Sequence, residues 1–455
     1  MNSRQDTTAV SPRRSDRKTS TPAVSSGATG SKQRTLMQAL RSSTLPISNF
    51  QLSPPNSANL PKDDTSTHFI YGERDDSGHS RVFDAQTGVE LRRHSDLWFY
   101  DGSLVCRAED TLFRVHMSLL ARHSVCFEDM MAIPQPEEEL NEKTGFDLSQ
   151  EKDWRTGSKT RARIPIIVLQ DSAEDVEYLL KALIDGPTFG NNDRDDFRVV
   201  SGILRLSTKY VFELLRSATL AHLSTAWPST LKGWELREDL AQSYELDHPH
   251  KQRLYPHPFL VISLAREVEA PHLLPAAFYD VSRYTYTQIF DPGEDDPFGL
   301  YPSPCPMIPP CDMQRLCVGK EATQHTITNL IQAMGNSLPN RQPALHSTHA
   351  HRRSSNGICM TATNCKKDFG ELVDLATQHY LFDRERGSCD PLYVAEELGQ
   401  LKGAEFSECK ACALSLECWA SREREKIWKM IPAWFRLDAP VGAATLKANV
   451  VTATI

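Results

Sequence analysis

The residues best suited to chemistry in this sequence are its cysteines, of which there are 11. Cys409 and Cys412 have the Cys-x-x-Cys spacing of a zinc-binding pair, and Cys418 follows soon after. Further cysteines lie upstream, at Cys359, Cys365 and Cys389. A structural zinc site needs four thiolate or imidazole ligands, which usually come as two close pairs. Only one close pair exists here, so we predict buried, unliganded thiols and no cofactor, with zinc on Cys409, Cys412 and Cys418 as the alternative.

Sequence motifs of known enzyme classes are absent. The chain has no Gly-x-Gly-x-x-Gly, no phosphate-binding loop, no His-Glu-x-x-His and no Gly-x-Ser-x-Gly. Three histidines, at His346, His349 and His351, fall in a polar stretch that we interpret as a loop. His116 precedes a predicted helix, where a hydrogen-bonded structural role fits better than catalysis. We therefore predict no catalytic residues and no enzymatic activity, since an enzyme here would need a site scattered through the sequence.

The overall composition describes a chain with a substantial core and a net negative charge. Its 455 residues include 51 Lys and Arg against 59 Asp and Glu, which gives a net charge of -8. That balance argues against a nucleic-acid binder, whose phosphate contacts require concentrated Lys and Arg. No run approaches the roughly 20 apolar residues of a membrane span, and no apolar export signal follows Met1. We expect an intracellular protein of the cytoplasm or nucleus, with mostly reduced cysteines and no membrane partner.

The charge is unevenly distributed along the chain. Residues 1–62 contain nine Lys and Arg but only two Asp and Glu, an excess of +7, and they lack a periodic apolar pattern. Such a segment cannot bury enough apolar surface to offset the entropy lost on ordering. We predict that residues 1–90 form a disordered, basic, Ser/Thr-rich tail.

From Leu97 onward the pattern predicts regular structure. Leu97 to Tyr100 and Leu104 to Cys106 are interpreted as two strands joined in a hairpin by Asp101-Gly102, whose residues tolerate positive φ. Two short helices follow, and then a strand over 164–169. A helix with one apolar stripe comes next, and the members of the stripe are Val176, Leu179, Leu180, Leu183 and Ile184. Two more helices extend to about Ala226, so we predict an α+β domain.

The residues of this predicted domain resemble a known family. The run from Asp110 to Ser124 contains a His-x-x-Leu-Leu-Ala-x-x-Ser pattern and is similar to the start of a BTB/POZ domain. Five further segments resemble a large fungal group of BTB proteins, namely residues 190–210, 227–234, 274–279, 409–412 and 426–435. The resemblance covers most of residues 91–437. It implies a hairpin, a helix, a strand and a helical cluster, in that order.

The resemblance also implies an interaction protein. A BTB/POZ-like domain over 91–228 would dimerise through its first strands and helix, and a charged insert at 135–163, which we expect to be disordered, would interrupt it. The residues expected to take part in interactions are Leu97, Phe99, His116, Leu119, Leu120, Phe127, Met130 and Met131. By analogy with BTB adaptors, the partners would be a second copy, a client protein and a cullin-type ubiquitin ligase scaffold. Leu140-x-Glu142 in the insert fits the hydrophobic-x-Glu element of such adaptors.

The remainder of the chain divides by composition. We predict a helical extension at 229–290, a Pro/His-rich linker at 291–357, a C-terminal helical region at 358–437 and a tail at 438–455. The linker is predicted because prolines crowd the segment from Pro292 to Pro310, and a helix interior does not tolerate them. The leading functional hypothesis is a dimerising adaptor or scaffold. The alternative is a nuclear, transcription-related regulator whose C-terminal module is stabilised by zinc.

Overall fold

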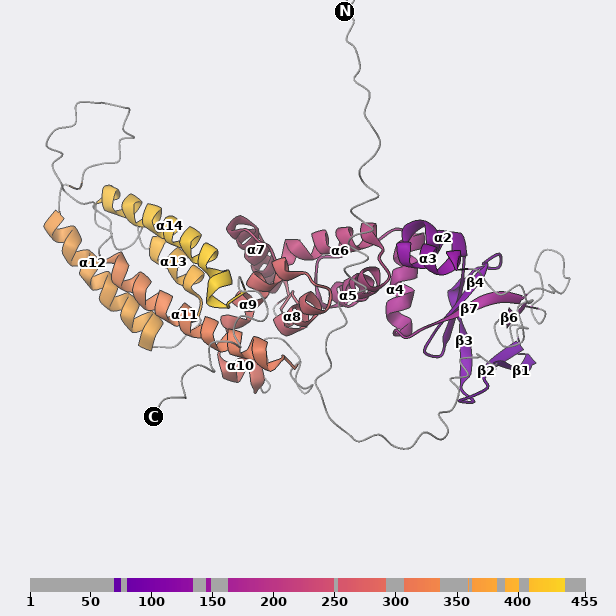
Figure 1. The fold of residues 1–455 in the computed structure, drawn as a ribbon. Helices are drawn as coiled ribbons and strands as arrows, with labels where there is room; N and C mark the ends of the chain where they lie inside the picture. The colour runs from indigo at the N-terminus through magenta and orange to yellow at the C-terminus, as the bar shows by residue number, and fades with distance from the viewer. Residues whose placement is uncertain are drawn as a thin grey trace, which may run out of the picture. The chain divides into compact units, whose positions relative to one another are not determined.

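The computed structural model shows a mixed α/β protein that combines one sheet with many helices (Figure 1). The residues it describes are 69–74, 80–133, 145–148, 163–248, 253–291, 307–335, 359, 362–382, 389–400 and 409–437. Most of the predicted N-terminal tail and all of the predicted C-terminal tail lie outside these residues. No helix among the described residues is long and apolar enough to cross a membrane.

The sheet has seven strands within the described residues, in the order β1-β2-β3-β5-β4-β7-β6. The strands are β1 (Phe69–Arg74), β2 (Ser80–Asp84), β3 (Glu90–Trp98), β4 (Leu104–Ala108), β5 (Thr111–Val115), β6 (Gly145–Asp147) and β7 (Arg163–Leu169). The pairs β3 with β5 and β4 with β7 are parallel, whereas the other neighbours are antiparallel. The predicted strand over 164–169 is therefore confirmed as β7.

The hairpin predicted at Asp101-Gly102 is wrong, because the strands on either side of that turn do not pair. β5 lies between β3 and β4, and the hairpin joins β4 to β5 through Glu109 and Asp110. Glu109 adopts a φ of 51°, a backbone conformation typical of tight connections. The turn at Asp101-Gly102 instead carries the chain across the end of β5, and the Gly102 N–H donates to the Phe99 carbonyl at 3.0 Å.

Apolar side chains cover both faces of the sheet. Alternation along β4 sends Leu104 and Cys106 to one face and Val105 to the other. The first face packs against the helices that follow. The second face carries a smaller cluster, made of Val82, Leu91, Val105, Leu112, Phe146 and Leu148.

Two regions predicted as disordered contain strands. β1 and β2 lie inside the predicted tail at 1–90, and β6 lies inside the predicted insert at 135–163. Phe146 of β6 is fully buried, and its ring meets edge-on the rings of Phe69, Tyr71 and Trp98. One aromatic residue among charged neighbours produces no periodic pattern. The sequence alone therefore could not reveal this strand.

Five helices pack around the first face of the sheet and confirm the helices predicted there. They are α2 (Met117–His123), α3 (Val125–Ala132), α4 (Ala173–Ile184), α5 (Arg194–Lys209) and α6 (Glu213–Ala226). Ser172 caps α4, because its Oγ accepts the Asp175 N–H at 3.1 Å. Val176, Leu179 and Leu180 of the predicted stripe are buried in the core.

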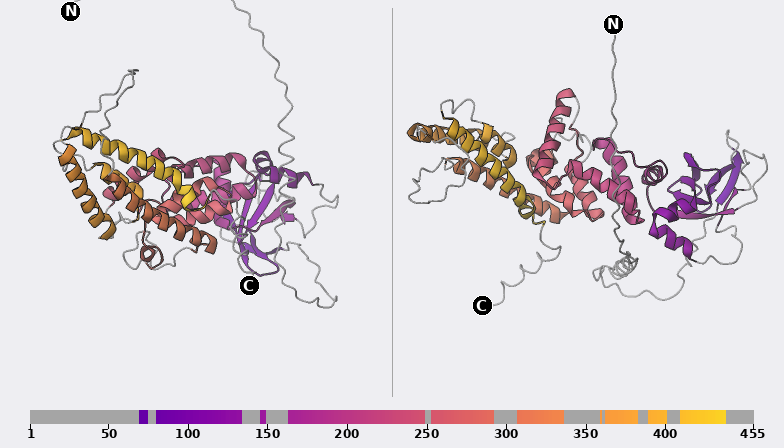
Figure 2. Two further views of the ribbon diagram at one scale, coloured as in Figure 1. Left: turned by 60° about the vertical axis from the view of Figure 1, so that its left-hand side comes forward. Right: turned by 90° about the horizontal axis from the view of Figure 1, so that it is seen from above.

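Helix α5 belongs to two cores at once. Its residues Phe197, Val200 and Leu204 face the helical region, whereas Ile203 and Leu206 face the sheet. The sheet therefore lies on one side of α5 and helices α7 to α14 lie on the other (Figure 2). Because α5 is packed on both sides, the sheet-containing part and the helical part meet across this shared helix rather than through a flexible linker.

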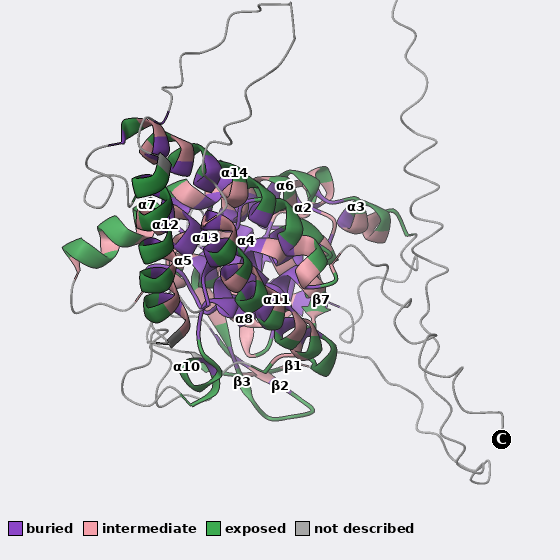
Figure 3. Ribbon diagram, turned by 90° about the vertical axis from the view of Figure 1, so that its left-hand side faces the viewer, coloured by how far each residue is buried: buried purple, intermediate pink, exposed green. Residues whose placement is uncertain are grey.

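The helical region begins directly after α6. Its elements are α7 (Leu231–Asp247), α8 (Pro258–Glu267), η2 (Pro271–Leu273), α9 (Leu274–Ser282), α10 (Tyr286–Phe290), α11 (Pro310–Met334), α12 (Ala362–Thr377), η4 (Gln378–Phe382), α13 (Pro391–Gln400) and α14 (Lys410–Trp434). Helices occupy most of the described residues of the two segments predicted as helical, 229–290 and 358–437. The outer helices present an exposed stripe to solvent and a buried stripe to the core (Figure 3).

The predicted linker at 291–357 is wrong in part, because α11 occupies the middle of it. The proline-rich run ends at Pro309 and Pro310, which stand at the N-cap and first position of the helix. Proline is tolerated there because the N–H it lacks would have no partner within the helix. Beyond it, Leu316, Ile327 and Ile331 are buried in the helical core.

Helix α11 approaches the end of α14 so closely at Gly319 that no side chain fits there. A Cβ added at Gly319 would lie 1.9 Å from Cε1 of Phe435, whose ring is fully buried and stacked on Phe278.

We expect Gly319→Ala to lower the free energy of unfolding by about 1–3 kcal/mol through overpacking, measured by urea denaturation. The matched control is Gly370→Ala on α12, where an added Cβ meets nothing within 4 Å. We expect this control to stabilise the protein by about 0.5–1 kcal/mol, and equal behaviour of the two variants would refute the contact.

Candidate functional site

The most unusual feature of the helical region is the charge inside it. Every residue of α9 except Pro275 is buried, and one of these residues is Asp280. Burying a carboxylate is costly unless it is paired and hydrogen-bonded. The surroundings of Asp280 therefore have to supply cations.

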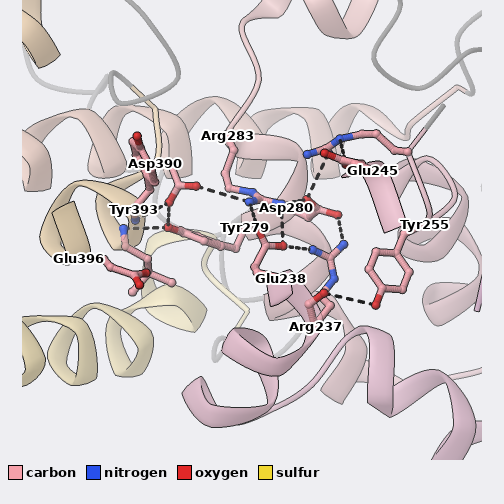
Figure 4. Close-up of polar contacts among 12 residues, drawn as sticks. Arg237, Glu238, Glu245, Tyr255, Tyr279, Asp280, Arg283, Asp390, Tyr393 and Glu396 are labelled. Carbon is pink, nitrogen blue, oxygen red and sulfur yellow. Dashed lines mark hydrogen bonds and ion pairs between the residues drawn. The ribbon is translucent and has the colours of Figure 1, made fainter. Parts of the chain in front are cut away.

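Two arginines pair with Asp280 (Figure 4). The Arg237 guanidinium of α7 donates to Asp280 Oδ2 at 2.5 Å, and Arg283 donates to Oδ1. Arg253 adds a third cation, with its Nη1 4.0 Å from Oδ1. The side chains of Arg237, Asp280 and Arg283 are all at most 3% exposed. These pairs are therefore largely removed from solvent screening.

Arg283 extends the network to two further carboxylates. Its Nη1 donates to Glu238 Oε2 at 2.5 Å and to Asp390 Oδ2 at 3.4 Å. Asp390 also accepts from the Tyr279 hydroxyl at 2.7 Å and from the Tyr393 N–H at 3.1 Å. Because Asp390 precedes α13, these bonds tie α13 to α9.

The network alternates guanidiniums with carboxylates and is bordered by aromatic rings. Three guanidiniums, those of Arg237, Arg253 and Arg283, face the carboxylates of Glu238, Asp280 and Asp390, and Arg253 also lies 3.8 Å from a carboxylate oxygen of the more exposed Glu245. The Arg237 guanidinium lies 4.5 Å from the Trp234 ring centroid and 4.4 Å from that of Tyr255. Such cation–π contacts stabilise a desolvated guanidinium.

The electrostatic consequences appear in the pKa values. Burial opposes ionisation of Asp280, yet Arg237 and Arg283 lower the pKa of its carboxyl below the ordinary value. The pKa of Glu238 is lowered in the same way, against the effect of burial, by Arg283 and Arg237. Burial and the nearby Arg283 lower the pKa of Arg253 to about 10. Both carboxylates therefore remain charged at neutral pH.

A groove of about 680 Å³ opens beside this network, between α7, α13 and α14. Its carboxylates are those of Glu235, Glu238, Asp239, Glu245, Asp390, Glu396 and Glu397, and its guanidiniums are those of Arg253 and Arg424. Arg424 of α14 pairs with Glu235 at 2.8 Å and with Glu396 at 3.2 Å, so it joins the three helices. The groove therefore carries a net negative charge, and it favours cationic ligands over anionic ones.

Several charged side chains of the groove are held in ion pairs. Glu238 is kept as a carboxylate by Arg283 and Arg237, which lower its pKa, so it does not have the raised pKa of a general acid. The described residues that line the groove include no cysteine, serine or histidine. The arrangement is suited to binding and to holding the helices together.

The interaction residues expected from the sequence fall into two groups. Leu97, Leu120 and Phe127 are at most 3% exposed and belong to the core beside the sheet. The prediction that these three residues contact a partner is therefore wrong, because buried side chains cannot do so. The others are half-buried, and they are Phe99, His116, Leu119, Met130 and Met131. These five remain a predicted interaction surface on α2, α3 and the end of β3. An apolar residue of a short helix can pack in the chain's own core or contact a partner protein, and the sequence alone does not distinguish these two roles.

His116 contacts the turn between β3 and β4. It stands at the N-cap of α2, where its ring stacks on Phe99 with centroids 5.7 Å apart. Its Nε2 lies 3.4 Å from Asp101 Oδ1. These contacts attach the start of α2 to the turn that precedes β4.

The structure changes the expected grouping of the cysteines. Cys409 and Cys412 lie together at the start of α14, but Cys418 is exposed and lies outside their group. Including Cys418 among the candidate zinc ligands is therefore wrong. The neighbours of Cys409 and Cys412 are Cys359 and Cys365, and all four Sγ atoms lie within 4.8 Å of one another. The sequence contained these two residues, but their spacing gave no sign that they would meet Cys409 and Cys412. His346, His349 and His351, which the sequence analysis interprets as part of a polar loop, lie outside the described residues.

Comparison with known proteins does not identify the chain. No protein-family model matches it, and no curated protein matches it. Its function has to be argued from its own residues.

Removal of the Asp280 charge tests the network. We expect Asp280→Asn to lower the free energy of unfolding at pH 7 by about 3–5 kcal/mol, because buried arginines would lose a partner. Urea denaturation followed by circular dichroism measures this, with Asp239→Asn at an exposed position of α7 as the control. An equal loss in both variants would contradict the network.

The same variant has a defined pH dependence. Because the pKa of Asp280 is lower in the folded protein than in the unfolded chain, its carboxylate stabilises the fold above the unfolded pKa, about 3.9. That contribution is lost as the pH falls towards the folded pKa. We therefore expect the stability gap between the wild type and Asp280→Asn to be constant near neutral pH and to narrow below about pH 4. A gap that widens with acid would show that the pKa of Asp280 is raised instead.

Proposed function

We propose that this chain is a protein–protein interaction module of the BTB adaptor type, which dimerises through its sheet-containing part and holds a client in its helical part. The observation that carries the proposal is the order of elements after Leu104. A β4–β5 hairpin is followed by the α2–α3 pair, by β7 beside β4, and by the cluster α4 to α6. This order is what the resemblance to BTB/POZ domains implies.

The serine of the sequence pattern supports the proposal further. Ser124 Oγ accepts the Phe127 N–H at 3.0 Å, which caps α3. The same hydroxyl donates to the Tyr210 carbonyl at 2.5 Å, at the end of α5. The pattern residue thus joins the short helices to the helical cluster, which gives a physical reason for a serine at this position.

Dimerisation is the part of the proposal that can be tested most directly in solution. Light scattering of the full chain should give twice the mass of one chain over a wide concentration range. We expect Leu119→Arg, at a half-buried position of α2, to shift the mass to that of one chain, because an arginine would be desolvated in the interface. The control is Leu214→Arg on α6, where the side chain is 77% exposed. A wild type that is a strict monomer would refute the dimer.

The client is proposed to bind in the groove between α7, α13 and α14. Its volume of about 680 Å³ lies within the range of ligand sites, and its excess of carboxylates is complementary to a basic segment. The network beneath it fixes Glu238 and Asp390, so these side chains are already ordered before binding. The proposed occupant is a Lys/Arg-rich segment of a partner protein.

A labelled oligo-arginine peptide tests the groove in the full chain. We expect binding that weakens with salt, and a loss of at least about tenfold in affinity for Asp239→Lys combined with Glu397→Lys. The control is Glu321→Lys on α11, an exposed acid that does not line the groove. Equal affinity of the two variants, measured by fluorescence anisotropy, would rule out the groove as the binding place.

Cullin recruitment stays a prediction from the resemblance. Met131 is half-buried on α3, and Leu140 lies outside the described residues.

A further inference from the structure

Four thiols from distant parts of the sequence meet at one place in the helical region. Cys365 stands in the first turns of α12, Cys409 is the N-cap of α14 and Cys412 lies in its first turn. Cys359 joins them from the segment before α12, and no Sγ pair among the four is more than 4.8 Å apart. Each of the four residues is at most 9% exposed.

The spacing of the sulfur atoms matches a metal site. Tetrahedral zinc with thiolates at about 2.3 Å places its sulfurs about 3.8 Å apart. The Sγ atoms of Cys359 and Cys365 are 3.7 Å apart. Four thiols that merely filled a core would have no reason to point at a common centre, since thiols make only weak hydrogen bonds.

The helix dipole of α14 favours negative charge at this place. Cys409 is the N-cap of α14 and Cys412 lies in its first turn, so the positive end of the dipole lies at these two residues.

The neighbouring residues complete a site of structural type. Phe369 and Leu416, one turn further along α12 and α14, are buried beside the cysteines in the helical core. Lys366 and Lys410 adjoin the cysteines in sequence at exposed positions, where they would offset the charge of a four-thiolate site.

We infer that Cys359, Cys365, Cys409 and Cys412 bind one structural zinc ion. Four sulfur ligands in a tetrahedral arrangement are typical of zinc, which has no redox chemistry of its own. The ion would join the start of α12 to the start of α14, two helices that are far apart in sequence. It would act as a covalent cross-link does, since the metal is bound in the folded state and not in the unfolded chain.

Metal analysis of the purified full chain tests the inference. We expect about one zinc per chain, and a fall to near zero in Cys412→Ser. The matched control is Cys418→Ser on the same helix, which is exposed and outside the group and should keep its zinc. A wild type with no metal, or with iron in place of zinc, would overturn the assignment.

A second measurement on the wild type covers the case in which Cys412→Ser does not fold. We expect the four thiols to resist alkylation until a strong chelator is added, whereas the exposed Cys311, Cys317 and Cys418 react in both conditions. Mass spectrometry of the peptides shows which cysteines have been alkylated in each condition. Disulfide bonds within the group, or protection that a chelator does not change, would overturn the zinc site.

Discussion

Burial of α9 is the constraint on which the rest of the helical region depends. This short helix brings a carboxylate into the interior, and the carboxylate can be ionised there only if cations accompany it. Arg237 comes from α7 and Arg283 follows α9, while Asp390 leads into α13. Elements separated by more than a hundred residues are thus held by one set of charges. Geometry of this kind specifies a single arrangement of the helices, because any shift would leave a buried charge unpaired.

The remaining packing follows from that centre. The helical core surrounds α9 and reaches α5, whose other face completes the core of the sheet. The groove is the place where the charge network comes to the surface, since Glu238 and Asp390 line it. The four cysteines belong to the same helical core, at the beginnings of α12 and α14. One packed region therefore links the candidate binding groove, the proposed zinc site and the sheet-containing part.

Local patterns in the sequence were sufficient for the elements that depend on local forces. The stripe of Val176, Leu179 and Leu180 predicts α4, because amphipathic helices bury residues at that spacing. Long α11 was missed because the prolines before it dominate the composition of the segment, although Pro310 occupies a helix position that suits it. Strand β6 was missed because its burial depends on Phe146 meeting three aromatic rings from other strands.

The candidate sites were less predictable than the elements, because they are assembled by tertiary contacts. Cys409 and Cys412 form a visible pair, but Cys359 and Cys365 join them only when the start of α12 meets the start of α14. The network shows the same dependence, since nothing local relates Asp280 to Arg237. Leu97 and Phe127 illustrate the converse error, in which apolar residues assigned to a partner surface belong to the chain's own core.

Hydrogen exchange in the native full chain tests the central role of α9 most directly. If α9 organises the core, its backbone amides exchange only through global unfolding and are as protected as those of α5. The amides of the more exposed helix α10 should exchange much earlier, which provides an internal reference. Exchange of α9 at the rate of α10, while α5 stays protected, would show that the helical region opens without its charge network and would contradict this account.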